Sequence, residues 1–397
     1  MDARALAAER ARRVWLKAGS ASFDTFRDLV SQTTDAAHWP FASSVEQNVL
    51  IYAGDEIRSL GQTDTGRLEL MAEWAEAFLS GPGVIVIRNA MRDRAVIDEA
   101  TAIFEGIIEE QRATDAGGGD HFAKPGANDR IWNALQKHCV AAPENFARYY
   151  GNIAIDLASR AWLGDGYQVT AQVNRVNPGG EAQTAHRDYH LGFMTPARLE
   201  AFPSHVHGLS PVLTLQGAIA HCDMPVESGP TLLLPFSQAF HEGYIAFSDP
   251  RYQDWFDDHH VQLPLSKGDA VFFNPAMMHA AGSNVSNDIY RMANLLQVSS
   301  AFGRPIEAVD RTRLCALLYP VLLAARQNAT MTDTEITCAL AATAEGYAFP
   351  TNLDTDPPVG GLAPKSQSDL MTEMLLAGVA PEEALAALRE QDERKRP

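Results

Sequence analysis

The sequence predicts a mainly β core flanked by helices, an α+β fold, and three observations indicate it. Between residues 167 and 300, short runs rich in β-branched and aromatic residues alternate with turns that contain Gly or Pro. That pattern is typical of a β-sandwich or barrel. The chain before residue 82 and after residue 306 has mostly helical periodicity. No Pro- or Gly-rich linker separates these parts, so we expect a single domain over residues 1–397. It would contain a helical extension (1–82), the β core with its early helices (83–302) and a second helical extension (303–397).

The flanking elements follow from periodicity and from helix-stop signals. Gly81-Pro82-Gly83 ends an amphipathic segment, and the four apolar residues after it are typical of a short buried strand. Pro381-Glu382-Glu383 suits the first turn of a terminal helix, where acidic groups favour the helix dipole. The expected helices are residues 2–18, 67–79, 95–110, 143–163 and 380–394, with further helix from 306 and a loop at 350–364.

The strands of the core are bounded by recognisable turns. Asn177-Pro178-Gly179-Gly180 ends the first strand, and Lys267-Gly268-Asp269 precedes an apolar one. The expected strands are residues 84–87, 167–176, 212–220, 231–235, 270–273 and 290–300. Gln172 and Asn174 share one face of their strand, which is either the inside or the outside of the core. The glycines at 117–119 open a polar loop through His121, Lys124 and Arg130, either a mobile lid or a surface connection.

Composition and charge exclude several classes of function. The net charge of −18 disfavours a nucleic acid or an anionic membrane as partner. No apolar run reaches the roughly 18 residues that a membrane span needs, and residues 1–17 lack the apolar core of a secretory signal. The four cysteines are scattered without a Cys-x-x-Cys pair, which is typical of a reducing compartment. We therefore expect a cytoplasmic protein of unknown oligomeric state, with neither a nucleic acid nor a membrane as partner; a small-molecule substrate is what the motifs below imply.

A His-x-Asp motif is the strongest chemical signal. His186 and Asp188 lie two residues apart, so on an extended segment both side chains point to the same face. Two protein ligands rarely suffice for a metal, and His279, after the apolar strand 270–273, is the best third candidate. Two histidines and one carboxylate on one face of an octahedron form the non-haem Fe(II) oxygenase arrangement. Arg291 follows twelve residues after His279, and a buried arginine grips a carboxylate through two hydrogen bonds.

In this order the motifs resemble those of the phytanoyl-CoA dioxygenase family of Fe(II)- and 2-oxoglutarate-dependent oxygenases. The resemblance runs from about Gly83 to Ser300 and rests on four segments. These are Gly83 to Arg88, His186-Arg187-Asp188, Asp223 to Pro235, and Gly268 through His279 to Arg291. It implies a double-stranded β-helix, or jelly roll. It also implies iron held by His186, Asp188 and His279, 2-oxoglutarate paired to Arg291, and O2 as oxidant in a hydroxylation that yields succinate.

The sequence departs from that family in places. Ala281 stands where a hydroxyl residue is usual, which leaves Ser283 as the candidate for that contact with the co-substrate. Gln216 stands where an aromatic residue often lines the co-substrate pocket, and Gln172 is a further candidate contact. Phe236-Ser237-Gln238 replaces the usual Gly-Ser-His. An insert, residues 195–211, is a candidate wall of the substrate pocket.

Two other functions remain open at this stage. One is a cupin-like isomerase or hydrolase that uses Mn or Zn in a similar barrel, and Arg291 with the motif order argues against it. The other is a catalytically silent scaffold of the same fold, which the intact ligand set disfavours. Stimulated decarboxylation of 2-oxoglutarate separates the first from an oxygenase, and iron binding separates the second.

Overall fold

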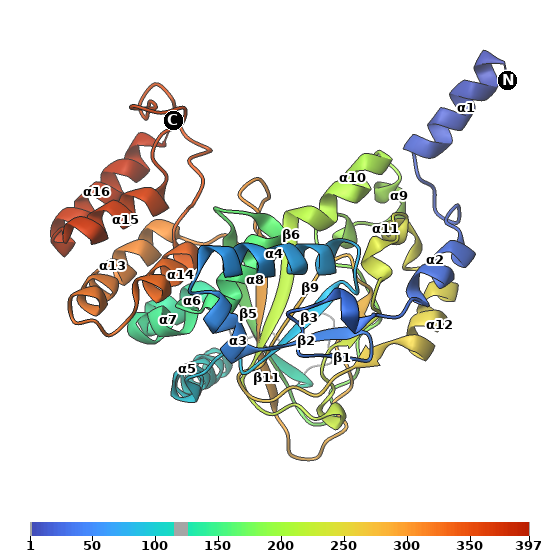
Figure 1. Ribbon diagram of the computed structural model, residues 1–397, viewed down its shortest axis with the longest axis horizontal. Coiled ribbons are helices and arrows are strands. Elements are labelled where there is room, and N and C mark those ends of the chain that lie inside the picture. The colour runs from blue at the N-terminus through green and yellow to red at the C-terminus, as the bar shows by residue number, and fades with distance from the viewer. Residues whose placement is uncertain (1, 115–125, 397) are drawn as a thin grey trace.

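The computed structural model describes residues 2–114 and 126–396 and combines many helices with one large and one small β-sheet (Figure 1). The loop predicted from Gly117, with His121 and Lys124, lies outside the described residues, whereas Arg130 is described. Across the described part of the chain, no helix is both long and apolar enough to cross a membrane.

The large sheet consists of β1 (Ser44–Glu46), β2 (Val49–Ala53), β3 (Val84–Arg88), β4 (Asn128–Ile131), β5 (Gln168–Val176), β6 (Thr214–Ala220), β9 (Ala270–Phe273) and β11 (Arg291–Ser299). The strand order is β1-β2-β3-β9-β6-β11-β5-β4. β11 pairs with both β5 and β6 in antiparallel register, so that Leu296 lies opposite Ala171 on one side and Gly217 on the other. Only the β2–β3 pair among these strands is parallel. The strand that begins with Arg291 is therefore held on both edges.

The small sheet consists of β7 (Leu232–Leu233), β8 (Val261–Gln262) and β10 (His279–Ala280), in the order β10-β7-β8. Its apolar side chains pack against one face of the large sheet. Leu233 and Val261 share a cluster with Val86, Val271 and Phe273. Residues of this same face line the cavity described below, so the candidate site is built between the two sheets.

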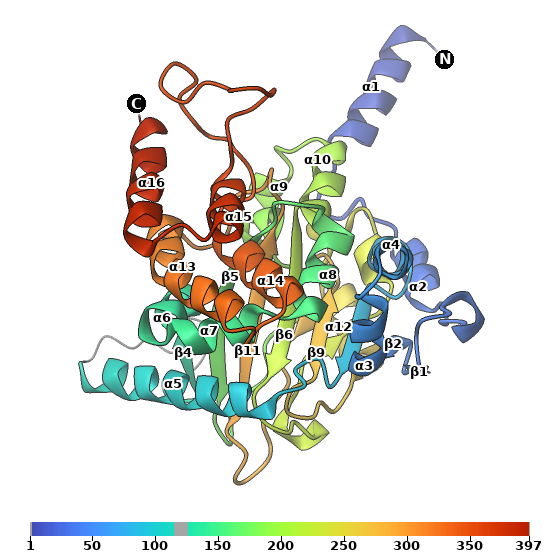
Figure 2. The ribbon, with the colours of Figure 1, turned by 60° about the vertical axis from the view of Figure 1, so that its left-hand side comes forward.

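Helices cover the opposite face of the large sheet (Figure 2). The α-helices are α1 (Ala3–Val14), α2 (Phe23–Val30), α3 (Gly54–Leu60), α4 (Asp64–Leu79), α5 (Arg94–Ala113), α6 (Ala134–Ala141), α7 (Pro143–Tyr150), α8 (Ile153–Leu163), α9 (Pro196–Leu199), α10 (Ser204–Leu209), α11 (Gly243–Ala246), α12 (Pro250–His259), α13 (Arg311–Gln327), α14 (Asp333–Thr343), α15 (Gln367–Ala377) and α16 (Pro381–Arg394). Helices α4, α6, α8 and α14 contact strands β3, β5 and β6 directly.

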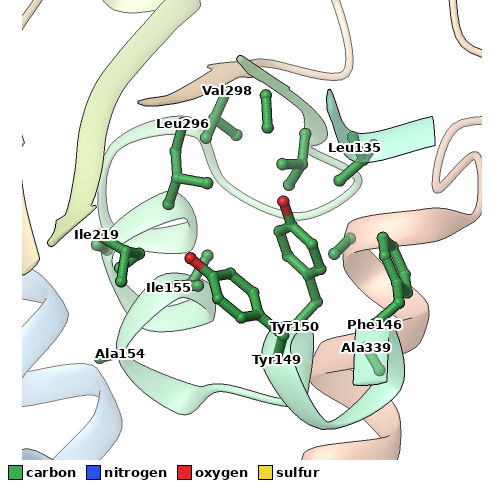
Figure 3. Close-up of a cluster of buried hydrophobic side chains, with 14 of the residues drawn as sticks. Leu135, Phe146, Tyr149, Tyr150, Ala154, Ile155, Ile219, Leu296, Val298 and Ala339 are labelled. Atoms are coloured by element: carbon green, nitrogen blue, oxygen red, sulfur yellow. The ribbon is translucent and has the colours of Figure 1, made fainter. Parts of the chain in front are cut away.

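The main core lies between this helical layer and the sheet. Figure 3 shows the rings of Tyr149 and Tyr150, on α7, among buried side chains that include Leu296 of β11. The amide of Asn294 donates to both phenol oxygens at 3.2 Å. Because buried tyrosine hydroxyls need hydrogen-bond partners, Asn294 allows α7 to pack its aromatic rings directly on the sheet.

The N-terminal segment, expected to be a helical extension over residues 1–82, also contains two strands. Strands β1 and β2 extend the large sheet from within it, and β2 pairs with β3. The reason is the run Val49-Leu50-Ile51-Tyr52, whose four residues are all buried and whose β-branched and aromatic side chains favour a strand. By contrast, helix α1 projects from the body (Figure 1) and has no buried residue.

The helix expected over residues 143–163 is two helices, α7 and α8. The break falls at Gly151 and Asn152. The side chain of Asn152 accepts hydrogen bonds from the N–H groups of Ala154 and Ile155, at 2.9 and 3.3 Å. Asparagine at this position caps the first turn of a helix, so Asn152 starts α8 in a new direction.

Candidate metal centre and active site

The candidate metal ligands lie on two segments that meet at one backbone bridge. His186 and His279 exchange N–H···O hydrogen bonds of 3.0 and 3.1 Å as an isolated antiparallel pair. His279 opens β10, and His186 follows the turn after β5. The N–H of Asp188 donates to the carbonyl of Pro275 at 2.9 Å. Backbone contacts thus bring the two halves of the site together.

The three side chains present their ligand atoms to a common point. These atoms all lie within 4.8 Å of one another. Asp188 Oδ1 is 3.7 Å from His186 Nε2, and Asp188 Oδ2 is 3.5 Å from His279 Nε2. Ligands about 2.0–2.2 Å from one ion are separated by about 3 Å when they lie at right angles, so the spacing suits a metal. Within residues 2–114 and 126–396, no other group of three such side chains comes together in this way.

Both imidazoles are oriented by their second nitrogen. Nδ1 of His186 lies 2.9 Å from the carbonyl oxygen of Thr184, and Nδ1 of His279 lies 2.8 Å from that of Met277. Because a carbonyl only accepts, each Nδ1 carries the proton and donates it. The lone pair of each Nε2 is then directed at the common point, the usual orientation of metal-binding histidines.

Gln216 holds the carboxylate of Asp188. Its Nε2 donates to Asp188 Oδ2 at 2.5 Å. Burial raises the pKa of Asp188, but its contacts with His279, His186 and Gln216 outweigh this effect and lower the pKa to about 2. The carboxylate is therefore ionised at neutral pH. Two neutral imidazoles and one carboxylate form the donor set that suits a non-haem Fe(II) ion.

A cavity of about 640 Å³ opens beside the three ligands and extends along the face of the large sheet. Its walls combine apolar side chains with a few polar ones. They include Arg130, Trp132, Gln172, Phe193, Gln216, Met224, Phe247, Leu265, Val271, Phe273, Arg291, Leu295, Gln297 and Ile306. A mostly apolar pocket with a few placed polar groups is typical of small-molecule sites.

Arg291 is a buried cation in the wall of this cavity. The residue is only 7% exposed. Among the described residues, no acidic side chain forms an ion pair with it, and burial lowers its pKa to about 10. A buried arginine without an anion is strongly disfavoured, so its guanidinium is suited to pair with an anion that enters the cavity.

The other predicted contacts divide into two groups. Gln172 and Gln216 both lie in the cavity wall, although Gln216 contacts Asp188 and Gln172 accepts a hydrogen bond from Arg130. Ser283 is exposed and lies outside the cavity lining, where its Oγ accepts from the N–H of Ala182 at 2.9 Å. The structure therefore places Ser283 outside the cavity wall in which Gln172 and Gln216 lie.

The insert at 195–211 does not contribute to the cavity wall, contrary to expectation. Its residues form α9, α10 and the start of a 3₁₀ turn, and the lining passes from Phe193 directly to Gln216. The insert instead packs beside the N-terminal segment, where Lys17 forms an ion pair of 2.8 Å with Glu200.

Sequence reasoning did not find one side of the cavity. Trp132 lies there with the guanidinium carbon of Arg130 4.6 Å from its ring centroid. Arg130 and Trp132 are two residues apart, and that alternation was the available signal for strand β4. The glycines at 117–119 predicted a loop that continued through Arg130, so the strand was not predicted.

The fold and the site together define a protein with a two-histidine, one-carboxylate metal centre beside a large β-sheet. The chain belongs to the phytanoyl-CoA dioxygenase family, whose model matches residues 68–293. This family comprises Fe(II)- and 2-oxoglutarate-dependent oxygenases, and the triad fits such an iron ion. No curated protein matches the chain.

Two solved structures from nogalamycin biosynthesis are similar to parts of the chain. The α-ketoglutarate-dependent epimerase SnoN is 17% identical, with a TM-score of 0.41, over 59% of this chain and 84% of SnoN. The α-ketoglutarate-dependent carbocyclase SnoK is 21% identical, with a TM-score of 0.43, over 59% of this chain and 86% of SnoK. Similarities of this extent are too weak to assign a fold or a reaction to this chain.

Proposed function

We propose that this protein is an Fe(II)- and 2-oxoglutarate-dependent oxygenase that hydroxylates a small or medium organic molecule. The observation that carries the proposal is Arg291, a buried guanidinium without an acidic partner among the described residues, in the same cavity as the metal-ligand set. A dicarboxylate such as 2-oxoglutarate satisfies both features, because one end suits the metal and the other suits the arginine.

The roles of the residues follow from their positions. His186, Asp188 and His279 would hold the iron, and Arg291 would pair with the distal carboxylate of 2-oxoglutarate. When bound, iron and 2-oxoglutarate supply the oxidising power from O2 as the keto acid is decarboxylated to succinate. Gln216 fixes the orientation of the Asp188 carboxylate. Apolar residues such as Val271 and Phe273 line the cavity, and an apolar surrounding of low dielectric constant strengthens an ion pair with Arg291.

Anaerobic addition of Fe(II) and 2-oxoglutarate to the purified protein tests the proposal. We expect the weak visible charge-transfer band of an iron-chelated keto acid, which should be absent when Zn(II) replaces Fe(II). His279→Ala removes one ligand and should abolish the band. A folded, iron-loaded protein that shows no band would contradict the assignment.

The type of oxidation requires a second measurement. Candidate small molecules should be screened for stimulated release of succinate under air. We expect the product to gain one oxygen atom by mass spectrometry, with the label from ¹⁸O2. A product of unchanged mass, or one that has lost two hydrogen atoms, would show another outcome of the same centre and exclude hydroxylation.

A further inference from the structure

One tight turn, residues 234–240, touches both halves of the candidate metal centre. We propose that Arg187 and Ser237 form a positioning pair that uses this turn to set the distance between the His186–Asp188 segment and His279. The inference rests on the proposed function, because it assigns a role at the same site. It concerns side chains that do not contact the metal themselves.

Arg187 connects the first half of the site to the turn. It stands between the two ligands of the His-x-Asp motif and is 2% exposed. Its guanidinium donates to the carbonyl oxygens of Phe240, at 3.3 Å, and Ser237. No acidic side chain among the described residues pairs with it, and its guanidinium carbon lies 5.5 Å from the ring centroid of Tyr244. Among the described residues, the hydrogen bonds of the Arg187 side chain therefore go to the turn.

Ser237 connects the second half of the site to the same turn. Its side chain is fully buried, and its Oγ accepts from the N–H of Met278 at 2.8 Å while donating to the carbonyl of Leu234 at 2.6 Å. Met278 directly precedes the ligand His279. The N–H of Leu234 also donates to the carbonyl of Met278 at 3.0 Å. Any shift of the turn would thus move the backbone next to His279.

Tyr244 and Gly243 complete the connection. The phenol of Tyr244 donates to the carbonyl of Asp188 at 3.0 Å. Gly243 provides the space for the guanidinium, because a Cβ at this position would overlap the Arg187 side chain. Residues 234–244 are therefore connected to the His186–Asp188 segment through Arg187 and Tyr244. They are connected to the backbone before His279 through Leu234 and Ser237.

The energetics of Arg187 favour a positioning role over simple stabilisation. Burying a cation without a counter-charge is costly, and an apolar side chain of similar size is often as stable or more so. Among the described residues, the hydrogen bonds to carbonyls satisfy the two terminal nitrogens of the guanidinium but leave its Nε without a partner and its charge unpaired. Arg187 contributes directional hydrogen bonds that an apolar side chain lacks. These hydrogen bonds hold the turn that contacts the backbone next to His279.

The test measures metal binding and not turnover. Co(II) replaces Fe(II), because its visible absorption reports coordination geometry and it is stable in air. We expect Ser237→Ala and Arg187→Met each to weaken Co(II) binding about 10–100-fold, the range found when residues behind metal ligands are changed, and to alter the absorption spectrum. Arg187→Lys, which keeps the charge and one donor, should recover part of the affinity. The double variant should lose less than the product of the single losses, because both act through one turn.

Matched controls separate positioning from stability. Arg311 is also buried and donates to the carbonyls of Val169 and Thr343, although it forms an ion pair with Glu345 at 3.0 Å as well. Ser159 is a buried hydroxyl bonded to the carbonyl of Ile155. Both lie away from the metal centre. Arg311→Met and Ser159→Ala should lower the unfolding temperature while Co(II) affinity and spectrum stay unchanged.

The outcomes are distinct. If the native protein does not bind Co(II) or Fe(II), the proposed function fails. If the native protein binds Co(II) and a folded Ser237→Ala binds it within twofold and with the same spectrum, the positioning pair is overturned while the function stands. Ser237→Ala, the smaller change, decides the matter if Arg187→Met does not fold.

Discussion

At the scale of single residues, two buried arginines near the site differ in their partners. Arg187 donates to backbone carbonyls of the 234–240 turn, whereas no hydrogen bond or ion pair from the Arg291 side chain is seen among the described residues. Burial lowers the pKa of both to about 10, so both remain charged at neutral pH. Among the described residues of the cavity wall, Arg291 is therefore a cation that no acidic side chain contacts.

Truncation of Arg291 should affect the co-substrate and not the metal. Arg291→Ala leaves the distal carboxylate of 2-oxoglutarate in a poorly solvated pocket. Breaking such a buried pair costs about 3–5 kcal/mol, or roughly two to three and a half decades in affinity. The KM for 2-oxoglutarate, measured by succinate release, should rise accordingly. Iron affinity should change little, and shorter keto acids that do not reach the arginine should lose much less.

Two results would refute that role. One is normal 2-oxoglutarate binding by folded Arg291→Ala. The other is a loss of iron as severe as that of His279→Ala, which would mean that Arg291 supports the metal site itself.

Local spacing and chain order indicate the residues that face the cavity, but not the contacts that cross between segments. The structure brings His186, Asp188 and His279 together and places Arg291 in the same cavity, as their motifs predict. Gln216 reaches Asp188 because β6 lies beside the ligand segment, a tertiary fact that no spacing shows. Ser283 was a candidate by its proximity to His279 along the chain, and the loop carries it outside the cavity.

At the scale of elements, two buried histidines lie in the helical layer and at its contact with the sheet. His221, just after β6, contacts Thr101 of α5 through Nδ1 at 2.8 Å and Tyr149 of α7 through Nε2 at 2.9 Å. His138 of α6 contacts Asn145 of α7 at 2.8 Å. Burial lowers the pKa of His221 to about 3 and that of His138 to about 4. Both are neutral in the folded protein over most of the acidic range.

Stability should therefore fall as the pH drops below the ordinary histidine pKa. In the unfolded chain these histidines bind protons from about pH 6.5 downward, whereas the folded protein excludes them until about pH 4 and below. Their contribution is complete above pH 6.5. It is lost at about 1.4 kcal/mol per pH unit for each histidine between pH 6 and 4. Urea unfolding at several pH values measures this slope.

The slope, and not the absolute stability, is the relevant quantity. His138→Gln should reduce it by about 1.4 kcal/mol per pH unit even if the variant is less stable at every pH. A variant with the native slope would show that His138 is not neutral in the fold.

The sequence pattern predicted strands that consist of long alternating or apolar runs. It did not predict a short strand within a polar segment or a break within a helical segment. Strands β5 and β11 match the expected segments closely. Strand β2 was not predicted because its four apolar residues are flanked by polar residues in the sequence. The strand is stabilised by pairing with β3, which lies more than thirty residues later in the chain. The helix break at Asn152 requires capping of α8, which periodicity alone does not show.

At the scale of the whole molecule, charge limits the substrate. The chain carries a net charge of −18, and the basic side chains in the described cavity wall are Arg130, Arg187 and Arg291. Arg187 is bound to the 234–240 turn, and Arg291 is assigned to the co-substrate. Lys124 lies outside the described residues. A polyanionic coenzyme A tail would therefore meet repulsion over most of the surface.

A free acid should accordingly be a better substrate than its coenzyme A thioester. Matched pairs of acid and thioester, compared by succinate release, should give a higher kcat/KM for the acid. The thioester should improve as salt is raised, because screening weakens the repulsion. Efficient turnover of thioesters with no turnover of the acids would refute this expectation, whatever the salt concentration.

The central place of β11 in the large sheet also sets an order of assembly. Its neighbours β5 and β6 are made far earlier along the chain, yet they contact each other only through β11, at residues 291–299. Until that strand is synthesised, two long apolar strands have unpaired edges, the kind of surface that favours aggregation. Pairings so distant in sequence form slowly. The strand that begins with Arg291 thus closes the sheet last, and a nascent chain places its candidate co-substrate anchor, Arg291, only in that late step.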